Sequence, residues 1–367
     1  MRLSAFGRKV IVMESGGCMN RMARALAVIV VVGCGGALAF SRSAHSSPQD
    51  ATPSRSFEFS EVVHVPAMAE GSKELRLWIP IPFEESHQPI TELKIDSPVP
   101  YRIEHEAEYG NRYAYLAVDA AQAKAPFDIR ISFHAQRFEN RVPLTGGAQS
   151  ASQIPIQPVI APARFLKADH LVPTDGVIAD LSQKERGEAT QPVDIARDFY
   201  NYIVATMHYD HDGTEWGRGD AVWACDSKHG NCTDFHSVFI GMARAAGIPA
   251  RFEIGFSLPA NSHEAAITSY HCWAQFYVQG IGWVPVDASE AWKNKDKRDY
   301  FFGAIDTNRL MMSLGRDIRL NPPQQGDPLN YFVYPYAELD GKAFSGLKNE
   351  YSFRDSAAAG PTVASSR

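Results

Sequence analysis

The sequence predicts an α+β protein in which an all-β sandwich precedes a domain whose cysteine-bearing helix packs on an antiparallel sheet. Three observations predict this class. Short runs in the first part of the chain alternate between apolar and polar residues, as strands with one buried face do. An amphipathic helical pattern that opens with a cysteine follows later in the chain. Two further strand-like runs joined by a glycine turn come next, and such a hairpin belongs to an antiparallel sheet.

The predicted sandwich occupies residues 57–140. The side chains of residues 75–79 follow an alternating pattern that ends at Pro80, and residues 113–118 form a second strand-like run. Residues 127–133 alternate strictly and place their apolar side chains on one face. Several strands separated by turn residues, without a helical period, are typical of a small β-sandwich.

Shifts in composition divide the rest of the chain. A stretch rich in Ser, Ala and Pro precedes the sandwich and a stretch rich in Gly and Ser follows it, and both compositions are typical of tethers and linkers. The predicted divisions are an export segment (1–39), a disordered tether (40–56), the sandwich (57–140), a linker (141–164), a catalytic domain (165–352) and a disordered tail (353–367).

The first residues are predicted to direct export. Arg21 and Arg24 precede a short apolar run, and residues 37–39 (Ala-Leu-Ala) match the small-residue pattern of a cleavage site. Residues 31–34 also resemble a lipoprotein box, in which Cys34 would carry a lipid, and an uncleaved N-terminal segment is a third alternative. We therefore expect a protein in the periplasm, or one anchored to the membrane and facing the periplasm or the outside.

Charge and motifs exclude other classes of function. The formal net charge is −6 and no basic run with interleaved aromatic residues occurs, so nothing predicts binding to nucleic acid. The sequence contains no glycine-rich phosphate loop of the expected spacing and no compact acidic loop of the EF-hand type. We therefore expect neither a cofactor nor a metal ion.

Cys232 opens the predicted amphipathic helix and is the candidate nucleophile. Apolar residues from Phe235 to Ala246 form its stripe, and Gly247 and Pro249 end it. At a helix start the free N–H groups and the helix dipole lower the pKa of a thiol. The backbone N–H there can also face a developing oxyanion. From its position alone, however, Cys232 is better interpreted as a small side chain packed at a helix end.

His271 and Asp287 are the candidate partners of the thiol. His271 heads the strand-like residues 271–278, and residues 280–282 (Gly-Ile-Gly) turn the chain into the run that Asp287 closes. Because hairpin strands are antiparallel, we expect both side chains at the same end. A neutral imidazole can take the thiol proton, and a carboxylate can hold the other imidazole N–H. Taken singly, a solvent-bonded strand-end histidine and a turn-capping aspartate are the ordinary alternatives.

Four segments together resemble the transglutaminase-like superfamily. They are residues 230–236 (Gly-Asn-Cys-Thr-Asp-Phe-His), 243–251 (Ala-Arg-Ala-Ala-Gly-Ile-Pro-Ala-Arg), 270–277 (Tyr-His-Cys-Trp-Ala-Gln-Phe-Tyr) and 282–287 (Gly-Trp-Val-Pro-Val-Asp). The resemblance covers roughly residues 195–292 and is specific for the fold and triad rather than for the substrate.

The resemblance implies a papain-like core with a catalytic triad. Cys232 would be the nucleophile, His271 the general base and acid, and Asp287 the group that orients the imidazole. The implied reaction is acyl transfer on a peptide or protein substrate, and we expect hydrolysis by a peptidase or amidase, because water needs no second recognition site. Cross-linking of protein glutamine, and a binding or scaffold protein with a vestigial triad, are the alternatives.

Four further residues are weaker candidates. Trp223 and Asn231 closely precede Cys232 and are candidates for an oxyanion or lid contact. His236 lies one turn after Cys232 on the same helix face, and Trp273 is a candidate wall of the cleft. A packed aromatic residue and a buried, hydrogen-bonded histidine are the ordinary alternatives for Trp223 and His236.

The cysteines after the export segment leave two alternatives open. If Cys232 stays free as a nucleophile, Cys225 and Cys272 are available to form a disulfide. Zinc is the other alternative, because a C-x3-H-x2-C-x3-H pattern is formed by Cys225, His229, Cys232 and His236. A zinc ion would consume the thiol and leave the histidine and aspartate of the hairpin without a role.

Overall fold

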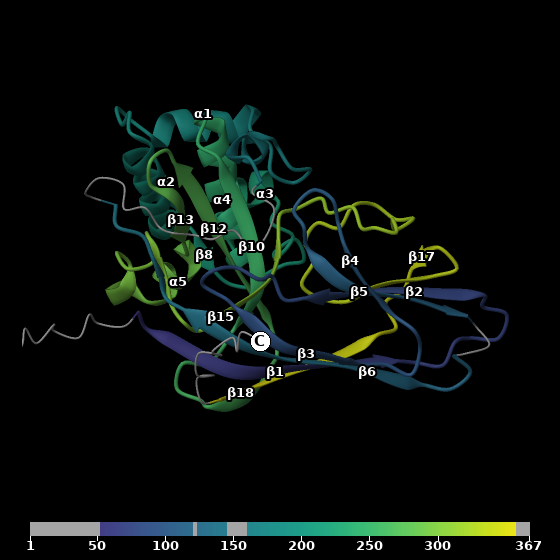
Figure 1. The fold of residues 1–367 in the computed structure, drawn as a ribbon. Helices are drawn as coiled ribbons and strands as arrows, with labels where there is room; N and C mark the ends of the chain where they lie inside the picture. The colour runs from purple at the N-terminus through teal and green to yellow at the C-terminus, as the bar shows by residue number, and fades with distance from the viewer. Residues whose placement is uncertain (1–51, 120–122, 145–159, 357–367) are drawn as a thin grey trace, which may run out of the picture. The chain divides into compact units, whose positions relative to one another are not determined.

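Two packed five-stranded sheets and a smaller sheet covered by helices form the part of the chain that the computed structural model describes (Figure 1). The described residues are 52–119, 123–144 and 160–356, and they belong to one compact unit, residues 51–367. The predicted export segment and residues 40–51 of the predicted tether lie outside them and stay predictions. The end of the predicted tether is wrong, because a strand begins at Ser54. None of the described helices is long and apolar enough to cross a membrane.

The first sheet of the sandwich has the strand order β11-β18-β1-β6-β3. In β1, alternate residues such as Phe57, Phe59 and Val63 are buried, which is the pattern of a strand with one face on a core. All four neighbouring pairs are antiparallel. The strands are β1 (Ser54–Val65), β3 (Ile90–Asp96), β6 (Phe127–Phe138), β11 (Glu264–Ile267) and β18 (Lys348–Asp355).

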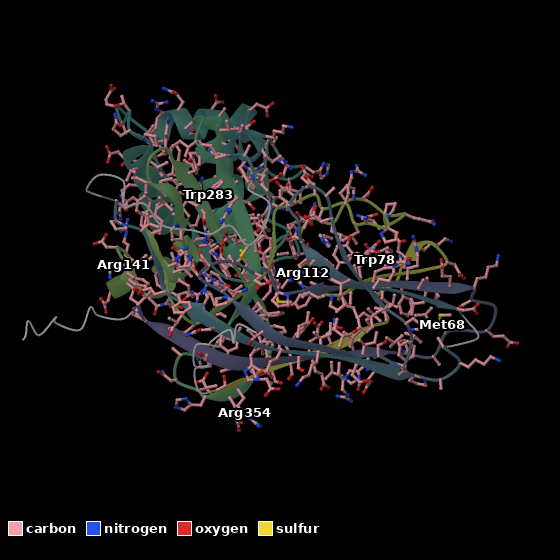
Figure 2. All side chains as sticks on the ribbon, in the orientation of Figure 1. Met68, Trp78, Arg112, Arg141, Trp283 and Arg354 are labelled. Carbon is pink, nitrogen blue, oxygen red and sulfur yellow. The ribbon has the colours of Figure 1, made fainter. Side chains whose placement is uncertain are left out.

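The second sheet has the order β17-β16-β2-β5-β4, and its inner face shares a core with the first. Its outer face is also covered, because Trp78 (Figure 2) packs there in a second apolar cluster and donates a hydrogen bond to the carbonyl of Pro322 (3.0 Å). The strands are β2 (Glu74–Ile81), β4 (Arg102–His105), β5 (Arg112–Asp119), β16 (Tyr336–Leu339) and β17 (Lys342–Ala343).

The predicted domain boundaries differ from this topology. Strands β11, β16, β17 and β18 come from beyond residue 260, yet they complete the two sandwich sheets, so residues 57–140 alone do not form the sandwich. The predicted tail from 353 is wrong at its start, because β18 runs to Asp355 and Phe353 is buried. The physical reason is that β1 and β2 would otherwise be open edge strands, and strand pairing covers them.

The sheet that carries the candidate site has the order β13-β12-β10-β15 and is antiparallel throughout. Helix α4 packs against β12 and β10, with the other helices around it (Figure 1). Its strands are β10 (Ala250–Ser257), β12 (Tyr270–Val278), β13 (Gly282–Val286) and β15 (Arg309–Leu314), and the helices are α1 (Gly176–Glu185), α2 (Pro192–Thr206), α3 (Ala221–Ser227), α4 (Cys232–Ala245) and α5 (Ala288–Lys293).

Short elements complete the described fold. They are β7 (Asn140–Arg141) paired with β14 (Ala304–Ile305), β8 (His208–Tyr209) paired with β9 (His229–Gly230), and the 3-10 helices η1 (Pro162–Leu166) and η2 (Lys295–Lys297). The predicted α+β class, with a cysteine-bearing helix on an antiparallel sheet and a β-sandwich, is confirmed.

Candidate active site

Cys232 is held at the first position of α4 by the residues around it. The Asn231 side chain accepts a hydrogen bond from Thr233 N (2.8 Å), and the Asp234 carboxylate accepts one from Asn231 N (2.9 Å), which together form a capping box. Gly230 has a φ of +139°, and a Cβ atom there would collide with the Asp234 carboxylate. The turn that presents Cys232 therefore depends on a glycine at this position.

Asp234 also forms hydrogen bonds with the loop at residues 217–219, which covers the start of α4. Its carboxylate accepts hydrogen bonds from Gly217 N (2.7 Å) and Gly219 N (2.9 Å). The carbonyl of Gly217 accepts hydrogen bonds from the hydroxyls of Tyr270 (3.4 Å) and Tyr331 (3.2 Å). Under this cover the thiol at the helix start is only 1% exposed.

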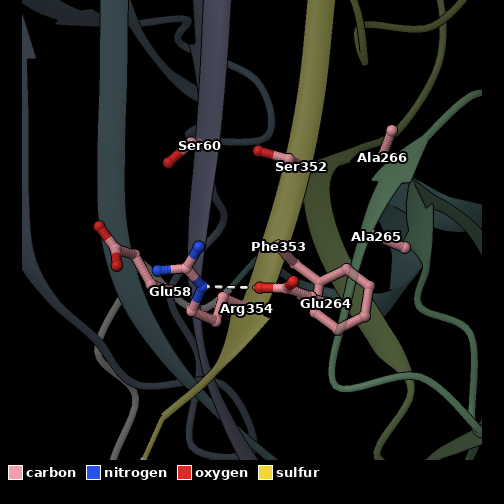
Figure 3. Close-up of a pocket in the computed structure, with 8 residues that line it drawn as sticks. All are labelled: Glu58, Ser60, Glu264, Ala265, Ala266, Ser352, Phe353 and Arg354. Atoms are coloured by element: carbon pink, nitrogen blue, oxygen red, sulfur yellow. Dashed lines mark hydrogen bonds and ion pairs between the residues drawn. The ribbon is translucent and has the colours of Figure 1, made fainter.

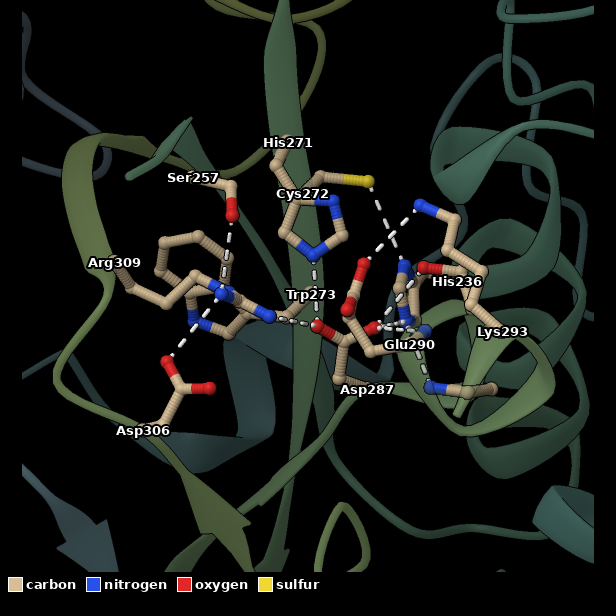
Figure 4. A network of polar contacts seen from close by, with 12 residues as sticks. His236, Ser257, His271, Cys272, Trp273, Asp287, Glu290, Lys293, Asp306 and Arg309 are labelled. Carbon is tan, nitrogen blue, oxygen red and sulfur yellow. Dashed lines mark hydrogen bonds and ion pairs between the residues drawn. The ribbon is translucent and has the colours of Figure 1, made fainter. Parts of the chain in front are cut away.

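His271 and Asp287 meet at one end of the hairpin, as Figure 4 shows. His271 is the second residue of β12, and Asp287 directly follows β13. Nε2 of His271 donates a hydrogen bond of 2.7 Å to Oδ2 of Asp287. This bond leaves Nδ1 for the Cys232 thiol, with which the imidazole is also hydrogen bonded. Sulfur, imidazole and carboxylate thus follow one another in the order that nucleophilic catalysis requires.

The charges of these groups stabilise one another. Burial disfavours the thiolate, but hydrogen bonds from Cys272 and His271, and the imidazolium charge, hold the pKa of Cys232 well below its ordinary value. Burial also opposes protonation of His271, yet the Asp287 carboxylate raises the pKa of His271 to about 9. Burial likewise opposes ionisation of Asp287, whose pKa is nevertheless held low by His271 and Arg309. These shifts favour the thiolate and imidazolium forms of the pair at neutral pH.

Arg309 is a buried partner of Asp287 that sequence reasoning missed. Its Nη2 lies 3.2 Å from Oδ2 of Asp287, and its Nη1 donates to Ser257 Oγ (3.2 Å) and Asp306 Oδ1 (3.3 Å) (Figure 4). Oδ1 of Asp287 meanwhile accepts a hydrogen bond from Glu290 N (2.9 Å) and caps α5. One carboxylate thus orients the imidazole, caps a helix and neutralises a buried arginine. A lone arginine at the head of an apolar strand is the sequence signal that marks it.

His236 lies beside Asp287 and Cys272, and its ring is also hydrogen bonded to the backbone of Cys232. Its fully buried imidazole accepts a hydrogen bond at Nε2 from Ala288 N (3.1 Å), so the proton is on Nδ1, 3.5 Å from the sulfur of Cys272. Burial lowers the pKa of His236 and keeps it neutral, although Oδ1 of Asp287 is 3.6 Å from Nε2. The geometry agrees with the ordinary alternative, a buried and hydrogen-bonded histidine.

The two tryptophan candidates make packing contacts. Trp223 in α3 is half-buried, and its ring packs edge-on against His229, with 5.1 Å between the ring centroids. Trp273 is fully buried and donates an indole hydrogen bond to Glu253. Its ring centroid lies 6.2 Å from that of His271, so it supports the imidazole from within the core.

The structure overturns two alternatives. The alternative of a Cys225–Cys272 disulfide is not realised, because all the cysteines in the described residues are free and Cys225 lies beside Lys228 (3.9 Å from Sγ to Nζ). The zinc pattern is not assembled, since within the described ranges no three His, Cys, Asp or Glu side chains are placed to hold a metal. His229 instead pairs through Nδ1 with the carboxylate of Asp210 at 2.7 Å.

Comparisons with known proteins agree with this fold. The family model described as the transglutaminase-like superfamily matches residues 179–288. An uncharacterized protein of Haemophilus influenzae is 28% identical over 355 residues, which cover 87% of this chain and 95% of the relative. A crystal structure from Cytophaga hutchinsonii, provisionally named as a cysteine protease, has a TM-score of 0.56 at 17% identity and covers 84% of this chain and 93% of its own.

A further solved structure is more distant. The periplasmic domain of TgpA from Pseudomonas aeruginosa has a TM-score of 0.33 at 14% identity, with 68% of this chain and 93% of that chain covered. The family match encloses α4, β12 and β13, which carry the candidate thiol, imidazole and carboxylate. Residues 179–288 of the chain are therefore a domain of the transglutaminase-like superfamily.

Proposed function

We propose that the protein is an enzyme that transfers acyl groups from peptide or protein amides through Cys232, His271 and Asp287. The hydrogen bond of 2.7 Å between His271 and Asp287, beside a thiol at a helix start, is the observation that carries this proposal. The acyl group is expected to pass to water, so the activity is that of a cysteine peptidase or amidase.

The reaction proceeds in two stages. The thiolate of Cys232 attacks the carbonyl carbon of the amide, whose oxygen takes the negative charge. The His271 imidazolium then gives its Nδ1 proton to the leaving amine as the C–N bond breaks, which leaves a thioester. The neutral imidazole next removes a proton from water as the water oxygen attacks the thioester. The acid leaves, and the thiolate–imidazolium pair is restored.

The backbone N–H of Cys232 is the candidate oxyanion donor. At the first helical position it has no partner within the helix, and it faces the hydroxyl of Tyr209. A substrate carbonyl that binds there displaces this hydroxyl. The side-chain amide of Asn231, an earlier candidate, donates to the Tyr270 hydroxyl at 2.8 Å and therefore supports the wall of the site instead.

Hydrolysis is favoured over cross-linking because of the confined site. The thiol is 1% exposed, so the covering loop must move before a substrate binds. Water is small and needs no second recognition site beside the thioester, whereas a protein lysine needs a second opening to the same sulfur.

The test is incubation of a peptide library with the parent protein and with Cys232→Ala, each with and without a primary amine. Hydrolysed peptides from the parent alone support a peptidase. Amine adducts from the parent alone identify a cross-linking enzyme. The absence of any product from a folded parent protein contradicts catalysis and leaves a binding or scaffold protein.

We also propose that the protein is exported by a cleaved signal. The support is the order of Arg21, Arg24, an apolar run and the Ala-Leu-Ala pattern at 37–39. Cell fractionation with N-terminal sequencing tests this: we expect a mature periplasmic chain, and Cys34→Ser should leave its fraction unchanged. Retention of Cys34 as a lipid-modified first residue would contradict the cleaved form.

A further inference from the structure

One tyrosine links the strand of the candidate base to the turn that carries the thiol. Tyr270 is the first residue of β12 and directly precedes His271. Its hydroxyl accepts a hydrogen bond from Nδ2 of Asn231 (2.8 Å) and lies 3.0 Å from Oγ1 of Thr233. These two residues stand on either side of Cys232. A single side chain therefore joins the base and the nucleophile through their neighbours in the chain.

The Asn231 amide ties the helix cap to Tyr270. Its Oδ1 accepts a hydrogen bond from Thr233 N (2.8 Å) and so caps α4, while its Nδ2 donates to the Tyr270 hydroxyl. The cap that places Cys232 at the helix start is thus connected to β12 by the same side chain. Without the hydroxyl, the buried polar groups of Asn231 and Thr233 would lose this partner, and a buried polar group is costly to leave without one.

The Tyr270 hydroxyl also reaches the loop that covers α4. Burial and the negative charge of the Cys232 thiolate raise the pKa of Tyr270, so the phenol keeps its proton. This proton points to the carbonyl of Gly217, 3.4 Å away. A Cβ atom at Gly217 would lie 3.2 Å from Nδ2 of Asn231 and 3.4 Å from the Tyr270 hydroxyl. The covering loop therefore packs directly on this junction.

Contacts of its own hold Tyr270 in place. Its backbone N–H donates a hydrogen bond to the Tyr334 hydroxyl (3.1 Å). Its ring lies against the rings of Tyr331 and Tyr334, with centroids 5.6 and 6.1 Å away. In the sheet, Phe256 of β10 is its partner. These contacts fix the ring independently of the thiol.

The segment that leads into Tyr270 is held by strand pairing. Strand β11 ends at Ile267, three residues earlier, and all its residues pair with β18. Figure 3 shows a cavity lined by these two strands and β1, in which Glu264 of β11 pairs with Arg354 of β18 (2.9 Å from Oε2 to Nε). Tyr270 thus follows a segment that belongs to the first sandwich sheet.

The distance between the sulfur and the imidazole decides how reactive the pair is. Cys232 and His271 are hydrogen bonded, and such a contact weakens steeply when its atoms move out of line. A misplacement of about 1 Å can lower the rate of an enzymatic reaction about 100-fold. Cys232 belongs to α4 and His271 to β12, so contacts between these elements set the distance. Tyr270 makes such a contact within one residue of each group.

We propose that Tyr270 is a positioning residue, whose hydroxyl holds the turn of Cys232 at the distance from His271 at which thiol and imidazole form their hydrogen bond. This role rests on the proposed acyl transfer through Cys232. It acts through Asn231 and Thr233 and needs no contact with the substrate.

The test is the pH dependence of the alkylation of Cys232 by iodoacetamide in Tyr270→Phe, which keeps the ring and removes the hydroxyl. A weaker contact with the imidazolium raises the thiol pKa, and a thiol pKa of about 8 leaves about 10% thiolate at pH 7. We therefore expect the rate at pH 7 to fall roughly tenfold and to approach the parent rate near pH 9. A general loosening of the fold would instead speed alkylation of the buried Cys225 and Cys272, which peptide mass spectrometry follows in the same samples.

Two further tyrosine variants are the controls. Tyr331→Phe removes the other hydroxyl that donates to the carbonyl of Gly217 (3.2 Å), so it loosens the covering loop and should keep the shape of the parent's pH profile. Tyr277→Phe changes the same strand as Tyr270 at its other end, where the ring packs against Trp283 (5.4 Å between centroids), and should label like the parent. Thermal unfolding establishes that each variant is folded.

The possible outcomes separate this role from the proposed function. A reactive parent whose pH profile is unchanged in Tyr270→Phe, or altered equally by Tyr270→Phe and Tyr331→Phe, would overturn the role of Tyr270 alone. A parent whose Cys232 reacts no faster than a free thiol at pH 7 would contradict the activated nucleophile, and the role of Tyr270 with it.

Discussion

Replacing Asp287 by Asn tests the electrostatic origin of the reactive thiol. The variant keeps the shape of the side chain and an oxygen that can cap α5, but it removes the charge 2.7 Å from Nε2 of His271. At an effective dielectric constant of about 20, two unit charges at that distance attract by about 6 kcal/mol. That energy corresponds to a fall of about four units in the pKa of His271, from about 9, so the imidazole of the variant is neutral at pH 7.

The expected loss of Cys232 thiolate is measured as a lower rate of alkylation of Cys232. With a neutral imidazole and a thiol pKa near its ordinary value of about 8.5, about 3% of the thiol is ionised at pH 7. The rate of labelling by iodoacetamide should therefore fall about thirtyfold at pH 7 and rise toward pH 9, whereas the parent rate is nearly flat across that range. Peptide mass spectrometry distinguishes Cys232 from Cys225 and Cys272, at reagent concentrations where the rate is first order in iodoacetamide.

The matched control is Asp306→Asn, which removes the other carboxylate bound to Arg309 and leaves the hydrogen bond of His271 intact. It should label like the parent. If Asp287→Asn kept the parent rate and pH profile, or if both variants lost the same reactivity, the assigned role of Asp287 would be wrong.

Three further results are expected. Gly230→Ala forces a Cβ atom against Asp234 at a positive φ, so urea denaturation should show that the free energy of unfolding falls by roughly 2–4 kcal/mol. An unchanged urea midpoint would contradict the close fit of Gly230 against Asp234. Glu61 is protonated in the folded protein up to about pH 8 but ionises above about pH 4.5 in the unfolded chain, so the free energy of unfolding falls as the pH rises between these values. In urea denaturation, the free energy of unfolding of Glu61→Gln should match that of the parent at pH 4 and exceed it by up to about 5 kcal/mol at pH 8. Arg309→Met removes a charge that lowers the pKa of His271, so NMR titration should find this pKa higher by roughly one unit. An unchanged pKa would show that the charge of Arg309 does not act on the imidazole.

The elements that carry the candidate triad could be predicted because their signals are local. The helix pattern after Cys232 and the stop at Gly247 predicted a helix that the structure has as Cys232–Ala245. The glycines at 280–282 predicted the hairpin of β12 and β13. The hairpin then placed His271 and Asp287 at one end, because antiparallel pairing leaves few other arrangements.

The surroundings of the site could not be predicted, because they depend on pairings between distant segments. An arginine at the head of an apolar strand marks Arg309 as unusual, but it does not show that the side chain is buried beside Asp287, since a charged residue at a strand end is usually exposed. Whether Cys272 forms a disulfide was left open, because spacing does not reveal which side chain faces it. Glu61 does interrupt the apolar face of β1, and that interruption is a sequence signal for an unusual buried group.

The position of β18 in the first sheet has a consequence for biosynthesis. The strand is made last, yet it lies between β1, which is made first, and β11, which leads into the strand of His271. While residues 348–355 are still inside the ribosome, β11 has no neighbour in that sheet and the approach to β12 is not anchored. Strand β12 itself pairs with β10 and β13, so we expect only the segment that leads into it, β11, to take its place after the whole chain has been synthesised.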